Sequence, residues 1–221
     1  GSRFMAAADA CRVPAGKALA VDREAFAAML TALVASQPRI RRVERNVCGL
    51  DDPVLAPFRT PEGTVVIAAG PLASEELSAS LAAAVGAEHC YFYDAIAPIV
   101  WTHSLDMSVV FRASRYGQEQ GDAPGEGDYL NCPMSREEYT AFYTALLEAR
   151  TVQAHAFESE RHFEGCMPIE ALAQRGDRTL TFGPLKPVGF VDPRTGRRPW
   201  AILQLRAEKA NGEACNLVGC Q

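Results

Sequence analysis

The spacing of hydrophobic residues predicts two helices in the first half of the chain. Apolar positions three and four residues apart follow Asp22, which is a good helix cap, and this pattern ends at Pro38. A similar pattern follows Ser74, with acidic residues in its first turn, and it ends before Gly86. Both segments are therefore predicted to be amphipathic helices, whereas residues 1–17 show no clear element.

The second half of the chain carries a stronger helix signal. Ser135 and Glu138 have the spacing of a capping box, in which each side chain bonds the other residue's backbone N–H. The apolar stripe behind them consists of Tyr139, Phe142, Tyr143, Leu146 and Leu147. A short helix over 168–174 begins at a proline, and Gly176 lies just beyond it. Helices are therefore predicted in both places.

Strands are predicted where β-branched and aromatic residues cluster between turn residues. The candidates are 40–47, 64–70, 90–101, 200–205 and 214–218. Residues 64–70 are continuously apolar, which is typical of a strand buried on both faces of a parallel sheet. Asn211 and Gly212 are the turn pair of a tight hairpin between the last two candidates. Together these elements indicate a mixed α and β fold.

Composition places the chain among soluble globular proteins. It has 221 residues, of which 48% are hydrophobic and 22% charged, and a formal net charge of −5. No apolar run approaches the roughly 20 residues of a membrane span, and no secretory signal is expected. The seven cysteines form no CxxC pair, and the four histidines have no ligand spacing. We therefore expect reduced cytoplasmic thiols, with no disulfide framework and no metal site.

Charge is distributed unevenly along the chain. Residues 175–209 hold eight basic and three acidic residues, a net charge of +5, so the remainder carries −10. Residues 39–45 add a second basic group. Such asymmetry favours a polyanionic partner on one face, and a solvated basic surface is the alternative.

One cysteine has a setting that indicates chemistry. Cys166 follows Gly165 and comes just before the proline that starts the short helix. The positive end of the helix dipoles favours a thiolate, and a thiolate adds to electron-poor ring carbons such as C6 of uracil. The alternative is that Cys166 is a small buried hydrophobe, which is the usual state of a free cysteine.

A second candidate site is formed by two loops rich in proline and glycine, at 183–189 and 192–199. Their basic side chains are Lys186, Arg194, Arg197 and Arg198. Arginines on stiff loops suit phosphate or carboxylate recognition, because a guanidinium binds both oxygens at once. A surface turn with solvated charges is the alternative. The chain carries no glycine-rich dinucleotide-binding fingerprint and no Walker loop.

Nine short segments of the sequence occur in a characteristic order, at 12–16, 18–26, 91–95, 97–100, 114–116, 128–134, 163–170, 182–189 and 192–199. Together they resemble one family, the folate- and FAD-dependent tRNA uracil-5-methyltransferases known as TrmFO or Gid. The resemblance covers nearly the whole chain but only an internal piece of the longer family proteins. Their opening flavin-binding strand, glycine loop and helix have no counterpart here, and neither does their closing flavin-contacting segment.

The resemblance implies an α/β fold of mixed α+β type, namely part of a FAD-binding Rossmann-type domain with an inserted α+β substrate domain. Residues 1–72 would be the trailing part of the FAD-binding domain. Residues 73–180 would be the inserted substrate or RNA domain, and 181–221 a strand pair that returns to the FAD-binding domain.

The same resemblance implies an activity. The family methylates the T-loop uridine of tRNA at C5, with carbon from 5,10-methylenetetrahydrofolate and hydride from FAD, and with NAD(P)H as a further cofactor. The implied partner is tRNA, with ribosomal RNA as the alternative and a second copy of the chain as a further candidate. The implied location is the cytoplasm, without membrane contact.

Site residues carry over position by position. Cys166 matches the family cysteine implicated in covalent catalysis on the uracil or the flavin. The residues assigned to cofactor binding are Ala69, Gly70, Arg197 and Arg198, and those assigned to RNA binding are Lys186 and Arg194. The family's strand ends Ala-Thr-Gly, so Ala69 stands where the family has threonine.

Two expectations concern the chain alone. It lacks the backbone donors of a glycine-rich helix start, so we expect it not to retain FAD and to be inactive by itself. The alternative function is a truncated, non-catalytic binding or interaction module derived from this family.

Overall fold

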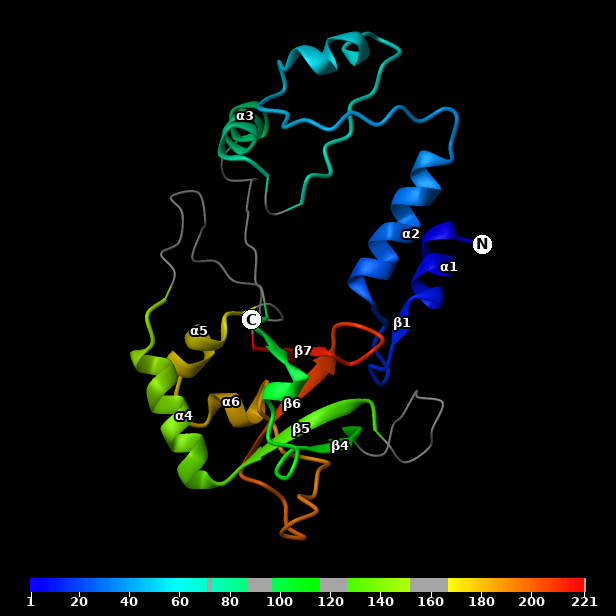
Figure 1. Ribbon diagram of the computed structural model, residues 1–221. Helices are drawn as coiled ribbons and strands as arrows, with labels where there is room; N and C mark the ends of the chain where they lie inside the picture. The colour runs from blue at the N-terminus through cyan, green and yellow to red at the C-terminus, as the bar shows by residue number, and fades with distance from the viewer. Residues whose placement is uncertain (71–72, 87–96, 116–126, 152–166, 221) are drawn as a thin grey trace. The chain divides into compact units, whose positions relative to one another are not determined.

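The computed structural model describes residues 1–70, 73–86, 97–115, 127–151 and 167–220 (Figure 1). The chain falls into two compact units. The first is formed by Gly1–Ile40, Ala95–Arg150 and Glu164–Gln221, and the second by Arg41–Asp94 and Thr151–Phe163. The domain boundaries expected near residues 72 and 180 stay a prediction.

A five-stranded antiparallel sheet forms the centre of the first unit. In spatial order its strands are β3 (Ile99–Trp101), β7 (Ala214–Leu217), β6 (Ala201–Ala207), β5 (Tyr129–Met134) and β4 (Phe111–Ala113). The central pair, β5 and β6, places Asn131 opposite Gln204. Because β6 and β7 are consecutive antiparallel neighbours, the predicted hairpin around Gly212 is confirmed.

Three helices pack against this sheet, namely α4 (Arg136–Glu148), α5 (Ile169–Gln174) and α6 (Thr179–Phe182). The members of their shared core that have no exposed surface are Ala173, Leu180, Leu185 and Ala201. The capping box of α4 is present, with the Glu138 N–H 3.2 Å from the Ser135 hydroxyl and the Ser135 N–H 2.7 Å from the Glu138 carboxylate. The mixture of α and β elements and the helices predicted over 135–148 and 168–174 are confirmed.

A fully buried polar side chain fixes the register of the central strands. The Asn131 amide nitrogen donates to the carbonyl oxygens of Phe111, Ala113 and Tyr129, at 3.3, 3.0 and 3.1 Å. Its oxygen accepts a hydrogen bond of 3.3 Å from the Gln204 amide. Buried polar atoms are costly when unpaired, so a shift of register by one residue would be strongly unfavourable.

The N-terminal segment consists of α1 (Arg3–Ala10), β1 (Arg12–Val13), β2 (Ala20–Val21) and α2 (Arg23–Ala35). β1 and β2 pair with each other in antiparallel fashion. Two long-range hydrogen bonds attach this segment to the start of β5. The Gly16 N–H lies 2.7 Å from the Asp128 carboxylate, and the Tyr129 hydroxyl lies 2.6 Å from the Ala15 carbonyl.

The first helix of this segment was not apparent from the sequence, because alanine-rich residues have helix propensity without a clear apolar period. The second, α2, is confirmed. The Asp22 carboxylate caps it by accepting the Ala25 N–H at 3.0 Å. Phe26 of α2 meets Phe4 of α1 edge to face, with ring centroids 5.1 Å apart.

The second unit contains a 3-10 helix, η1 (Pro53–Phe58), and the predicted helix after Ser74, α3 (Glu75–Val85), which ends at Gly86. The Ser74 hydroxyl caps α3 by accepting the Leu77 N–H at 3.3 Å. The Ser80 hydroxyl of α3 accepts the Leu50 N–H at 3.0 Å, which joins α3 to the segment that precedes η1.

Two strand predictions are wrong. Residues 40–47 and 64–70 form no strand, and the side chain of Val66 in the second segment is 81% exposed. A strand needs neighbouring strands for its backbone hydrogen bonds, and no strand lies in the described residues of this unit. The sheet that the structure does describe is antiparallel, not parallel. Of the candidate 90–101, residues 90–96 lie outside the described residues, and β3 occupies its end.

Within the described residues, none of the helices has both the length and the apolar character needed to cross a bilayer. The described cysteines, Cys11, Cys48, Cys132, Cys215 and Cys220, are free thiols.

Two glycines provide a matched test of the fold. Both Gly127, next to β5, and Gly212, in the hairpin, have φ near the left-handed region, at 65° and 67°. A Cβ atom at Gly127 would lie 2.3 Å from the Cα of Ala113, whereas nothing lies within 4 Å of a Cβ at Gly212. We predict that Gly212→Ala lowers the free energy of unfolding by about 1 kcal/mol, from backbone strain alone.

Gly127→Ala should cost about 2 kcal/mol more than Gly212→Ala, because the backbone of β4 must move. Urea-induced unfolding of the two variants and the unaltered chain measures the difference. Equal losses of stability would show that Gly127 does not approach β4 closely.

Candidate functional site

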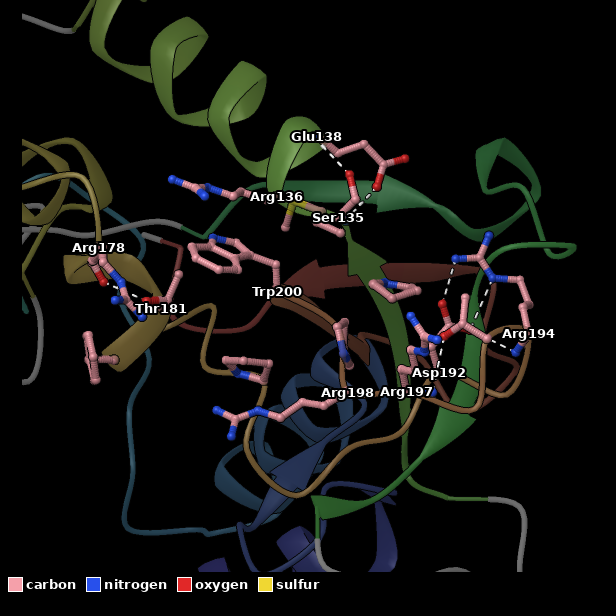
Figure 2. A pocket seen from close by; sticks show the side chains of 16 residues that line it. Ser135, Arg136, Glu138, Arg178, Thr181, Asp192, Arg194, Arg197, Arg198 and Trp200 are labelled. Carbon is pink, nitrogen blue, oxygen red and sulfur yellow. Dashed lines mark hydrogen bonds and ion pairs between the residues drawn. The ribbon is translucent and has the colours of Figure 1, made fainter.

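A pocket of about 780 Å³ opens where the end of β5, the first turn of α4, α6 and the loop before β6 meet (Figure 2). Its polar lining consists of Ser135, Arg136, Glu138, Arg178, Thr181, Asp192, Arg194, Thr195, Arg197 and Arg198. Its apolar wall includes Phe182 and Trp200. The pocket therefore combines five arginines with two aromatic rings.

Asp192 organises the loop that forms one wall of the pocket. Its backbone N–H donates to the Arg197 carbonyl at 2.9 Å, and its carbonyl accepts the Gly196 N–H at 2.8 Å. Its carboxylate, in a residue only 4% exposed, accepts three hydrogen bonds from Arg194: 2.9 Å from the backbone N–H, 3.1 Å from Nε and 2.8 Å from Nη2. Both backbone and side-chain hydrogen bonds therefore hold the loop at 192–197 closed; Figure 2 shows the contact between Asp192 and Arg194.

The ion pair inside this loop shifts the pKa values of both partners. Hydrogen bonds from the Arg194 side chain lower the pKa of Asp192, against the opposing effect of burial, and the same contact raises the pKa of Arg194. The pair therefore stabilises the loop fully above the usual aspartate pKa, and this stabilisation is lost as the pH falls through the lowered value. The negative charges of Glu138 and Asp106 also raise the pKa of Arg194.

Trp200 lies among arginine–aromatic contacts at the other wall. The guanidinium carbons of Arg136 and Arg178 lie 5.2 and 5.3 Å from the centroid of its ring, and that of Arg178 lies 5.5 Å from the ring of Phe182. The backbone N–H of Trp200 donates to the Met134 carbonyl at 3.0 Å, so the end of β5 holds the backbone that carries the indole ring. Its indole nitrogen is buried and has no hydrogen-bond partner among the described residues.

Tyrosines of α4 position the segment that carries Arg178. The Tyr139 hydroxyl donates to the Asp177 carbonyl at 2.6 Å, and the Tyr143 hydroxyl donates to the Ala173 carbonyl at 2.9 Å. Burial raises the pKa of Tyr139, which keeps its hydroxyl protonated as a donor. Two of the apolar-stripe residues of α4 thus also hold the pocket wall.

Arg115 attaches the loop at 183–189 to the sheet. Its guanidinium donates to the carbonyls of Val188 and Lys186 at 2.5 and 3.1 Å, and to the Gln204 side chain at 3.1 Å. The same group lies 4.9 Å from the ring centroid of Phe190. Arg115 therefore anchors the backbone that leads into the arginine loop at 192–199.

Four of the pocket arginines have no carboxylate partner within the described residues. They are Arg136, Arg178, Arg197 and Arg198. The pocket's two carboxylates are already engaged, Glu138 in the capping box and Asp192 with Arg194. Unneutralised guanidiniums gathered around one pocket favour a ligand with phosphate or carboxylate groups.

The structure brings together only part of the site that the sequence suggested. Arg194, Arg197 and Arg198 line one pocket, whereas Lys186 is exposed and does not line it. Ala69 and Gly70 belong to the second unit, and Cys166 lies outside the described residues. The roles expected for these residues stay predictions. The Arg194 side chain also contacts the Asp192 carboxylate, at 3.1 and 2.8 Å.

Sequence reasoning missed Arg136, Arg178, Phe182 and Trp200. Arg178 belongs to the basic segment 175–209, but its neighbours along the chain do not indicate a contact with Trp200. Arg136 follows the capping serine, a position from which a side chain at a helix start can face a neighbouring loop. The sequence signal that could have indicated this part of the pocket is Trp200, the aromatic residue directly after the arginine loop at 192–199. Its arginine partners, Arg136 and Arg178, lie far from it along the chain.

Comparison with known proteins places the chain within a family. A family model described as "Glucose inhibited division protein A" matches residues 1–221, and the chain belongs to this family. It is 63% identical over its whole length to a protein of Nitratidesulfovibrio vulgaris (strain Hildenborough), 58% to one of Oleidesulfovibrio alaskensis and 54% to one of Geobacter sulfurreducens.

Each of these three relatives is named "Methylenetetrahydrofolate--tRNA-(uracil-5-)-methyltransferase TrmFO". The chain covers 45%, 47% and 48% of their respective lengths, so it spans about half the length of the curated relatives it matches. The resemblance noted from sequence strings is confirmed over the complete chain.

The Asp192–Arg194 pair can be tested by proteolysis. Trypsin cleaves after Arg194 and Arg197 only when the loop opens, because the protease needs an extended backbone. We predict that Asp192→Ala increases the cleavage rate at these two bonds roughly tenfold at pH 8, since it removes charge-assisted hydrogen bonds that keep the loop closed. Mass spectrometry of the fragments identifies the bonds that are cut.

Glu148→Ala, at the exposed end of α4, is the matched control, because it removes a carboxylate that makes no contact with the loop. It should leave the cleavage rate unchanged. Equal rates for Asp192→Ala and the unaltered chain would show that the ion pair does not close the loop.

Proposed function

We propose that the protein is a tRNA (uracil-5-)-methyltransferase that uses folate and flavin. The support is the family match over residues 1–221 and the shared name of relatives that are 54–63% identical to the chain. Because the chain covers less than half of each of these relatives, the proposal concerns the whole protein and not these residues alone. The proposed substrate is tRNA, with ribosomal RNA as the alternative, and the proposed location is the cytoplasm.

The observation that carries the proposal is the set of arginines without carboxylate partners around the pocket. A uracil methyltransferase must hold a polyanionic RNA, and phosphate contacts from arginine supply most of such affinity. Arg197 and Arg198 extend from a loop that Asp192 already closes, so they would bind phosphate with little loss of backbone freedom. Lys186 and Arg194 are proposed to extend this contact with RNA.

The cofactors of the proposed reaction are 5,10-methylenetetrahydrofolate, FAD and NAD(P)H. When bound, the folate would supply the carbon, FAD the hydride and NAD(P)H the electrons that reduce FAD. The described residues fit the anionic parts of these groups, because Arg197 and Arg198 offer guanidiniums that form no ion pair with another described residue. Ala69 and Gly70 are exposed, and nothing lies within 4 Å of a Cβ at Gly70, so a ligand has access to the backbone there.

Cys166 is proposed as the nucleophile. The described cysteines provide a contrast, because burial raises the pKa of Cys132 and of Cys220 to about 11. Such thiols are almost entirely protonated near neutral pH and are poor nucleophiles. Cys48 is exposed but belongs to the second unit.

The arginine pocket is tested in the whole enzyme by measuring 5-methyluridine in tRNA. We predict that Arg197→Ala and Arg198→Ala each raise KM for tRNA by about tenfold and reduce the salt dependence of tRNA binding by about one counterion. Arg197→Lys and Arg198→Lys should recover the salt dependence, because they keep the charge, but only part of the affinity.

Arg23→Ala on α2 is the matched control, because Arg23 is exposed and lies outside the pocket. It should leave KM unchanged. Absence of 5-methyluridine with the unaltered whole protein, supplied with all three cofactors, would contradict the proposed function and favour a non-catalytic interaction module.

The proposed nucleophile is tested by thiol labelling and by activity. We predict that Cys166 reacts with a small alkylating agent at pH 7 several times faster than Cys48, because a catalytic thiol has a lowered pKa. Mass spectrometry of the labelled whole protein gives both rates. Cys166→Ser should abolish methylation, whereas Cys48→Ser should keep it. Labelling of Cys166 that is no faster than labelling of Cys48 would refute the lowered pKa of Cys166.

A further inference from the structure

The rings and guanidiniums at one wall of the pocket form a continuous column. Arg136 and Arg178 both lie within cation–π range of Trp200, at 5.2 and 5.3 Å, and Arg178 reaches on to Phe182 at 5.5 Å. We call these four residues the stacking column. Its members come from α4, from the start and end of α6 and from the residue before β6, so the tertiary fold assembles it.

The outer end of the column is unusually exposed for an aromatic residue. Phe182 is 71% exposed, although it is the last residue of α6 and its neighbours Leu180 and Thr181 are buried. Leaving a phenylalanine ring in water forgoes most of the roughly 2 kcal/mol that its burial would contribute. The ring is nevertheless positioned, because Arg178 contacts it from the column side and it lines the pocket.

The inner end of the column carries positive charge that no carboxylate among the described residues balances. Two guanidiniums lie near the single ring of Trp200, and within the described residues neither makes an ion pair. The same pocket is lined by Arg197 and Arg198, which also make no ion pair with any residue in the part of the chain that the structure describes. A ligand that suits this arrangement has a flat ring to stack and several negative charges beside it.

We propose that the stacking column binds an unpaired nucleobase of RNA, which stacks on the ring of Phe182 while phosphates flanking the base contact Arg197 and Arg198. This inference rests on the proposed function, and it assigns a base contact to a pocket that was so far assigned only charge. Every base has a flat face, so stacking on Phe182 requires a base outside a duplex but no particular sequence.

The charges favour RNA over a single small ligand. Arginines lie on two sides of an open pocket of about 780 Å³, which suits the successive phosphates of a chain that passes through. A base that leaves its stack in RNA loses stacking free energy. Stacking on an aromatic ring beside an arginine offsets that loss. A folate is the competing ligand, because it also joins a flat ring to carboxylates, and the experiment must separate the two.

The test uses the whole protein and two RNA probes of equal length, one a stem with an unpaired loop and the other a fully paired duplex. We expect Phe182→Ala to weaken binding of the looped RNA by about tenfold and to leave duplex binding unchanged. Phe182→Trp should bind the looped RNA as well as the unaltered protein does, whereas Phe182→Leu, which keeps the apolar bulk but not the flat face, should behave like Phe182→Ala.

Salt dependence separates stacking from charge. The Phe182 variants should keep the salt dependence of the unaltered protein, whereas Arg197→Ala should lower it for both RNAs. Phe58→Ala is the matched control, because Phe58 is a similarly exposed phenylalanine, 54%, in the other unit. It should change neither affinity. Equal loss of looped and duplex RNA by Phe182→Ala would overturn the proposal.

A spectroscopic readout is independent of activity. Trp101 and Trp200 are the two tryptophans of the 221 residues, so a Trp101→Phe variant in which any tryptophans outside these residues are also replaced reports on Trp200 alone. Looped RNA should quench its fluorescence, and the duplex should not. Methylation with normal KM for tRNA in Phe182→Ala would overturn the stacking proposal and leave the proposed function intact. A KM for folate raised tenfold in that variant, with RNA binding unchanged, would likewise overturn it and assign the column to the folate ring.

Discussion

The antiparallel pairing of β5 with β6 is the constraint on which the rest of the first unit depends. It brings Tyr129–Met134 beside Ala201–Ala207, two segments separated by α4, α5, α6 and the loops at 183–199. The register is held by Asn131, whose buried amide is fully engaged by three carbonyls and by Gln204. Since β5 leads directly into α4 and the arginine loop leads directly into β6, this one pairing places the start of α4 against the loop.

The pocket divides its charged residues into two kinds. Asp192 and Glu138 are committed to backbone and side-chain contacts that shape the walls, and Arg194 is neutralised by its contact with Asp192. The remaining arginines are exposed and have no carboxylate partner among the described residues. Structural carboxylates thus create rigid walls without cancelling the positive charge that the walls present. A rigid, positively charged pocket binds an anion at a lower entropic cost than flexible surface lysines would.

Local signals in the sequence were reliable where a few neighbouring residues decide the outcome. Caps at Asp22, Ser74 and Ser135 each predicted a helix start that the structure contains, because a cap bonds the N–H groups of the next turn and needs nothing distant. The hairpin at Gly212 was predictable for the same reason. Residues 64–70 show the limit, since their apolar run predicted a buried strand, but burial and pairing require partners that the sequence pattern cannot specify.

By itself, the sequence determined the helix caps, the hairpin, the basic character of residues 175–209 and the family to which the chain belongs. Only the tertiary structure decided which arginines share a pocket. Arg136 and Arg178 are joined to Trp200 by the β5–β6 pairing and by the tyrosine contacts of α4, not by any spacing along the chain. The physical reason is that charge and ring contacts act through space over a few ångströms, whereas sequence patterns report on the next turn of helix or the opposite strand of a hairpin.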